Sequence, residues 1–220
     1  MVGSTKVNTI KQNARMKQFI GWTTAVVFPI AILGTEKSYI PPIAALIIYW
    51  IFGGIVVRNM LSNKLPYLEM RIKGAKRELI ITLIITLAAV VNCFISGIKF
   101  NMSMNNSLLA IFIFCLLNSI LEPLILANIY DLAGCRIKFL GYAAVGINII
   151  MMYALFWSKY TVLFNDAGMV TWILQVVGLG IPILIYEKTE DITIWNIQRI
   201  IYNLIVLYFG GFDIIKLLHI

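Results

Sequence analysis

Histidine is almost absent from this chain of 220 residues, and cysteine is scarce. There is one histidine, His219, and there are three cysteines, none of them in a CxxC pair. A zinc site usually takes three or four histidine, cysteine or carboxylate ligands. A serine or cysteine nucleophile needs a nearby base, most often histidine, and no such pairing is visible. We therefore expect no metal ion, no cofactor and neither of these catalytic classes.

Charge is also scarce. Only 13% of the residues are charged, 60% are hydrophobic, and the mean hydropathy is +0.89. Soluble domains are about a quarter charged and about half apolar, so the composition predicts an all-α integral membrane protein with one transmembrane domain, 1–220. The net charge of +8 does not indicate nucleic acid as a partner, because the basic residues lie between apolar runs rather than on one face.

The apolar runs predict a polytopic bundle. A membrane helix needs about 20 mostly apolar residues. The first run is short and the last can divide at Gly210-Gly211, so the expected number of transmembrane helices is about seven, from six to eight. The runs are 18–34, 39–61, 79–98, 106–130, 138–157, 169–186 and 193–217.

The basic residues predict the orientation. With the N-terminus inside, fourteen Lys and Arg residues fall in cytoplasmic segments and four in outer segments, a clear positive-inside bias. We expect a multi-pass protein of the cell membrane with a cytoplasmic basic tail, 1–17, and a cytoplasmic basic connector, 62–78. The run after the tail has no small-x-small cleavage site, so it is interpreted as the first membrane helix.

Glu122 is a charged side chain at membrane depth. An ionisable group in hydrocarbon costs about 2.5–3.5 kcal/mol on insertion scales and usually has a partner. Asn118 lies four residues earlier on the same helical face. Pro123 follows directly and frees a backbone carbonyl that a side chain or water must satisfy. Two interpretations stay open, namely a neutral carboxyl that packs against a neighbouring helix and a charged group with an intramembrane partner.

Arg199 is the candidate partner. Asn196, Arg199 and Asn203 are spaced i, i+3 and i+7 and form one helical stripe. Arg199 can snorkel to the cytoplasmic interface, or it can pair with Glu122 across a helix contact. We predict that Glu122 and Arg199 are neighbours.

Three further polar side chains, Asn92, Asn148 and Gln175, lie alone in apolar runs. Such groups usually form hydrogen bonds between membrane helices, and Asn148 is also a candidate for the polar site. The predicted polar intramembrane site comprises Asn118, Glu122, Asn148, Asn196, Arg199 and Asn203.

Two motifs resemble those of the CAAX-protease and bacteriocin-processing (CPBP, or Abi) family of intramembrane proteins. The run ILIYEKTEDITIWNIQRIIYNLIVLYF resembles the last family motif, His-x-x-x-Asn, with Arg199 at the histidine and Asn203 at the asparagine. The run NSILEPLILANIY resembles Glu-Glu-x-x-x-Arg, with Glu122 at the first glutamate, Pro123 at the second and Ala127 at the arginine. The intermediate Phe-x-x-x-His motif falls near 142–156, where there is no histidine.

The resemblance implies a degenerate, non-catalytic member of that family. Active members use glutamates and histidines to activate a water for peptide hydrolysis. Here Glu122 is the only candidate base, and Arg199 cannot transfer protons because it stays protonated. The implied roles are bacteriocin self-immunity or a subunit of a peptide maturation or export complex, with the lipid bilayer and a membrane protein or peptide as partners.

Two alternatives stay open. The chain can be a small transporter membrane subunit, or a divergent intramembrane protease with Glu122 as the base. A polar cavity around Glu122 favours transport or catalysis, whereas a solid core with an apolar outer stripe favours binding of a partner protein.

Overall fold

The computed structural model describes residues 2–35, 40–58, 66, 68–95, 108–161, 169–210 and 212–218. Within these ranges the regular structure is helical, apart from one isolated antiparallel bridge between Thr161 and Phe212. The α-helices are α1 (Val2–Thr35), α2 (Pro42–Tyr49), α4 (Lys76–Ile95), α6 (Asn118–Ala133), α7 (Lys138–Leu155), α9 (Met169–Gly180), α10 (Ile183–Thr189), α11 (Thr193–Gly210) and α12 (Ile214–Leu218). The other helices are two π-helices, η1 (Trp50–Val56) and η2 (Ile111–Leu117), and the 3-10 helix η3 (Trp157–Lys159).

Five helices in the described part of the chain are long and apolar enough to cross a membrane. They are Ala14–Gly34, Lys76–Ile95, Leu108–Ala133, Lys138–Lys159 and Met169–Thr189. Pro42–Val56 is apolar but shorter. The expectation of an all-helical, multi-pass membrane protein is confirmed in this form, while a count of about seven spans stays a prediction.

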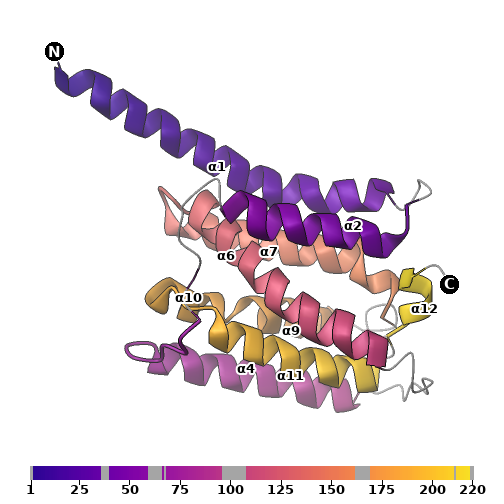
Figure 1. Ribbon diagram of the computed structural model, residues 1–220. Helices are drawn as coiled ribbons and strands as arrows, with labels where there is room; N and C mark the ends of the chain where they lie inside the picture. Colours follow the sequence, from indigo (N-terminus) through magenta and orange to yellow (C-terminus); the bar gives the residue numbers. More distant parts are fainter. Residues whose placement is uncertain are drawn as a thin grey trace.

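Helix α6 lies at the centre of the bundle. It contacts α1, α7 and η1 on one side and α11 on the other (Figure 1). Helices α4, α9 and α11 form the opposite side, where α4 contacts both of the others. The predicted basic tail forms the first part of α1 from Val2 onward, and these first turns extend beyond the other helices (Figure 1). The central position of α6 is the reason why its polar side chains are buried.

Helix α1 crosses α6 at a position without a side chain. A Cβ atom added to Gly21 would lie 2.5 Å from the backbone nitrogen of Ala133. Real Cβ contacts are never this short, so only glycine allows the two backbones to approach in this way. Small residues serve the same purpose in membrane helix contacts generally, because lipid provides no hydrophobic driving force between helices.

Prolines leave backbone carbonyls without a helical partner at three places, two inside helices and one between α9 and α10. Proline has no backbone N–H, so the carbonyl four residues earlier loses its helical partner. The prolines are Pro29, Pro123 and Pro182, and the freed carbonyls belong to Ala25, Ser119 and Gly178. Each carbonyl accepts a hydrogen bond from a side-chain amide of another segment. Asn148 Nδ2 donates to the Ala25 carbonyl at 3.1 Å. Asn196 Nδ2 donates to the Ser119 carbonyl at 3.3 Å, and Gln198 Nε2 donates to the Gly178 carbonyl at 3.0 Å. The carbonyl freed by Pro123 thus lies within reach of a side-chain amide, one of the two expected kinds of donor, side chain or water.

Polar contacts join the connectors at each end of the bundle. Segments with a predicted cytoplasmic location are linked by Arg58–Asp131, Lys138–Glu187 and Lys188–Glu78, each at 2.6 Å. Segments predicted to lie outside are linked by the bridge from Thr161 and by a hydrogen bond from the Asp213 N–H to the Tyr160 carbonyl at 2.8 Å. No contact described here joins a predicted inner connector to a predicted outer one.

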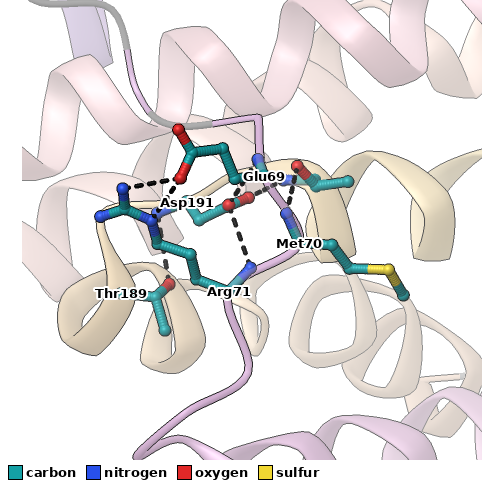
Figure 2. Close-up of polar contacts among 6 residues, drawn as sticks. Glu69, Met70, Arg71, Thr189 and Asp191 are labelled. Atoms are coloured by element: carbon teal, nitrogen blue, oxygen red, sulfur yellow. Dashed lines mark hydrogen bonds and ion pairs between the residues drawn. The ribbon is translucent and has the colours of Figure 1, made fainter.

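Asp191 holds the described part of the basic connector against the start of α11 (Figure 2). Its Oδ2 accepts the backbone N–H of Glu69 at 2.9 Å and of Arg71 at 3.1 Å, and its Oδ1 accepts the Thr193 N–H at 2.7 Å. Met70, between the two donors, has the left-handed φ of 55° that lets both amides face one carboxylate. Burial alone would raise the pKa of Asp191, but these hydrogen bonds and that of the Thr193 hydroxyl hold it below its usual value.

Candidate functional site

Glu122 and Arg199 form an ion pair in the centre of the bundle. Arg199 Nη2 lies 2.8 Å from Glu122 Oε2, and both side chains are 0% exposed. Arg199 also donates from Nη1 to the Tyr153 hydroxyl at 3.1 Å. The prediction that the two charges are neighbours is confirmed. Because Arg199 is 0% exposed, its interpretation as a snorkelling residue is wrong, while the charge state of Glu122 stays a prediction.

Glu122 and Arg199 interact through charge rather than through two parallel hydrogen bonds. Although Nη2 and Oε2 are close, the N–H bonds of the guanidinium are not directed at the carboxylate. Neither Glu122 oxygen accepts a well-aligned hydrogen bond from any residue that the structure describes. Coulomb attraction does not depend on this alignment, and at such a distance in a low-dielectric interior it is large. The pair is therefore coupled mainly through charge.

The other two members of the α11 stripe also contact α6. Asn203 Nδ2 donates to Ser119 Oγ at 2.9 Å and to the Phe114 carbonyl at 3.1 Å. Asn196 donates to the Ser119 carbonyl freed by Pro123. Phe114 lies in the π-helix η2, a type of segment that often occurs at functional sites. The predicted stripe is thus a single line of polar contacts between α11 and the segment η2–α6.

Asn118 and Asn148 differ in their relation to the pair. Asn118 is buried one turn before Glu122 on α6, and its amide has no well-aligned partner within the described residues. Asn148 accepts from the Tyr49 hydroxyl at 3.1 Å and donates to Ala25, so it joins α7 to α1 and α2 instead. The structure brings five of the six predicted residues to the contact between α6 and α11 and assigns Asn148 to helix packing.

The remaining lone polar groups act as predicted for helix–helix hydrogen bonds. Asn92 Nδ2 donates to Thr171 Oγ1 at 2.8 Å, and Gln175 Nε2 donates to Cys93 Sγ at 3.5 Å. Both contacts join α4 to α9. Cys93 is buried and reduced, as an unpaired cysteine in an apolar segment is expected to be.

A second polar cluster was not predicted from the sequence. Asn128 Nδ2 donates to the carbonyls of Gly53 and Gly54 at 2.8 Å each, and Arg58 Nη1 donates to Asn128 Oδ1 at 3.4 Å. Asp131, which pairs with Arg58, also accepts from the Tyr186 hydroxyl at 2.7 Å. Both glycines belong to the π-helix η1. The only signal in the sequence is Asn128, an amide within an apolar run whose partners lie far away in the chain.

The geometry of the central pair does not suit water activation. A general base must reach a water and the substrate, whereas Glu122 is fully buried and in contact with a guanidinium. Arg199 stays protonated and cannot carry the proton away. The described residues also contain no group of three or more histidine, cysteine, aspartate or glutamate side chains that can hold a metal ion.

Comparison with protein-family models, with curated proteins and with solved structures finds no match for this chain. The resemblance to the CPBP family therefore depends on the motif around Glu122 and the motif around Arg199. The structure places these two motifs in direct contact.

Proposed function

We propose that this chain is a non-catalytic relative of the CPBP (Abi) proteins that acts in the cell membrane by binding a membrane protein or peptide. Such binding would serve one of two processes. One is bacteriocin self-immunity, and the other is peptide maturation or export, with this chain as a subunit of the complex. The observation that carries the proposal is the buried contact between Glu122 and Arg199. Glu122 is the carboxylate that the resemblance assigns to the catalytic base, and in this structure it is in contact with Arg199.

The distribution of polar and apolar surface supports binding over transport. The polar side chains at the centre are buried among the described helices, so they do not line an open path. The outer surface of α4 is apolar, with Leu83, Leu87 and Ile95 each more than half exposed. A closed core with an apolar outer stripe is suited to contacts with lipid and with a partner helix.

We further propose that the N-terminus is cytoplasmic, because of the positive-inside bias. A cysteine introduced at position 5, in a chain whose exposed Cys135 is replaced by serine, should resist an impermeant thiol reagent in intact cells. One at position 37, which lies outside the described residues, should be labelled. Permeabilised cells, in which both sites react, serve as the control, and the reverse pattern in intact cells would refute this orientation.

The purified chain should cleave no peptide. In vesicles that contain a membrane-embedded peptide or a prenylated CAAX peptide, we expect no product above that of protein-free vesicles, because Glu122 cannot activate a water. An active family member in the same vesicles is the positive control. Turnover that disappears in Glu122→Gln but persists in Glu187→Gln, a glutamate in a partly exposed ion pair, would show that the chain is a protease.

A further inference from the structure

Residues 68–73 of the basic connector, which we call the strap, lie against the link between α10 and α11 (Figure 2). The two carboxylate oxygens of Asp191, in this link, have separate roles. Oδ1 accepts the Thr193 N–H at the start of α11. Oδ2 accepts two backbone N–H groups of the strap, those of Glu69 and Arg71. One oxygen of Asp191 therefore caps a helix, and the other holds the strap.

The backbone is strained on both sides of this contact. Met70 and Glu190 are the two non-glycine residues with a positive φ in the part of the chain that the structure describes, at 55° and 54°. Residues with a Cβ atom rarely adopt this left-handed conformation, because Cβ crowds the following carbonyl. Met70 lies between the two strap donors, and Glu190 directly precedes Asp191. Such strain persists only where other contacts hold it, and it is common in segments that switch between conformations.

A glycine provides a pivot between the strap and α4. The Ala75 N–H donates to the Ile72 carbonyl at 3.0 Å and closes a turn that contains Gly74. Gly74 has a φ of 90°, and a Cβ atom added to it would meet nothing within 4 Å. A residue without a side chain, in open space, allows the backbone to rotate at this point.

The apolar contacts of the strap are separate from the main core. Ala75, Ile185 and Ile194 are buried in a small cluster of their own. Ile72 of the strap and Leu79 of α4 pack against this cluster and are only partly buried. A segment with few buried apolar contacts can open locally at a low free-energy cost while the rest of the fold stays intact.

We propose that the strap opens and closes as a unit, and that Asp191 Oδ2 holds it closed against the strain in its backbone. In the closed state, which is the one described here, Ile72 packs on the small apolar cluster. In the open state the strap turns about Gly74, Met70 relaxes, and Ile194 becomes exposed at the predicted cytoplasmic end. The strap thus regulates the exposure of an apolar surface. This device goes beyond the proposed partner function and does not depend on it.

Thiol labelling of the purified full chain in mild detergent measures the opening. The reporter is Ile194→Cys, in a chain whose exposed Cys135 is replaced by serine. The other two cysteines are buried. Labelling of the reporter by a water-soluble maleimide should be slow, and Asp191→Asn should accelerate it at least tenfold, because hydrogen bonds to a charged acceptor are strong.

Asp191→Asn is selective for the strap. Asparagine keeps one oxygen, which can accept the Thr193 N–H, but its NH₂ group cannot accept the strap N–H groups that Oδ2 binds. The matched variant is Asp213→Asn, because Asp213 also accepts a backbone N–H, that of Lys216, but lies away from the strap at α12. Asp213→Asn should leave the labelling rate of the reporter unchanged.

A second pair of variants tests the strain at Met70. Met70→Gly and Met70→Ala both remove the side chain, but only glycine adopts a φ of 55° without strain. The reporter should therefore be labelled several-fold more slowly in the glycine variant than in the alanine variant. This comparison does not require Asp191→Asn to fold.

Three results would overturn the proposal. The first is a labelling rate that Asp191→Asn does not change. The second is an equal acceleration by Asp191→Asn at Ala127→Cys, a reporter on α6 at a site that is 0% exposed, which would mean that the whole bundle loosens. The third is equal labelling in the two Met70 variants.

Discussion

Glu122→Gln and Arg199→Gln should each lower the free energy of unfolding by about 3–5 kcal/mol, the usual cost of removing one partner of a buried ion pair. Glu122→Gln keeps the size of the side chain, whereas Arg199→Gln shortens it and removes donors. Either change leaves the other charge alone at 0% exposure. No water is present at this depth to solvate the remaining charge. Equilibrium unfolding in mixed micelles with increasing SDS measures the loss.

The matched control is the pair Lys138–Glu187. Its contact distance is 2.6 Å, but its side chains are 70% and 22% exposed. Glutamine keeps an oxygen that can accept from the Tyr142 hydroxyl, the other partner of Glu187. Glu187→Gln should therefore cost less than about 1 kcal/mol, as the loss of a solvent-screened pair does. A loss as small in Glu122→Gln as in Glu187→Gln would mean that the buried contact contributes no more than a surface pair.

Asn148→Leu should lower the free energy of unfolding by about 1–3 kcal/mol, because it leaves the Ala25 carbonyl and the Tyr49 hydroxyl without their partner. Part of this loss should be suppressed by Pro29→Ala. Alanine at position 29 restores the N–H that a helix directs at the Ala25 carbonyl. The same mixed-micelle unfolding experiment on the single and double variants provides the measurement.

The suppression is specific to the freed carbonyl. The bond between Asn148 and Tyr49 is unaffected by the change at Pro29, so the rescue should be partial. If Asn148→Leu costs the same in the Pro29→Ala chain as in the wild type, the amide does not compensate for the proline. The same reasoning applies to the amides that satisfy Ser119 and Gly178.

The helical layout was largely predictable because long apolar runs have few alternatives in a membrane. Breaks within the runs were harder to predict. The run 39–61 contains the short helix α2 followed by the π-helix η1. The carbonyls of Gly53 and Gly54 in η1 accept hydrogen bonds from Asn128, which is distant in the chain. The π-helix therefore depends on a tertiary contact that the local sequence does not indicate. The last run divides near Gly210, at the position where two adjacent glycines weaken a helix.

The central pair was predictable because two charges at membrane depth are rare and costly. Tyr153, which binds Arg199, and Ser119, which binds Asn203, gave no such signal, since tyrosine and serine are tolerated in membrane helices without a charged partner. Pro123 indicated that a carbonyl needs a donor, but the identity of the donor depends on which helix packs opposite. Asn196 fills that role only because α11 crosses α6 at this level.

The coupling energy between Glu122 and Arg199 tests the central claim most directly. A double-mutant cycle of Glu122→Gln, Arg199→Gln and the double variant, each unfolded under identical conditions, gives this quantity. A charge-coupled structural pair at 2.8 Å predicts that the double variant is more stable than the sum of the single losses implies, by about 3 kcal/mol. Single losses that simply add, with a coupling near zero, would show that Glu122 is not held by Arg199 and would contradict the account of a closed, non-catalytic core.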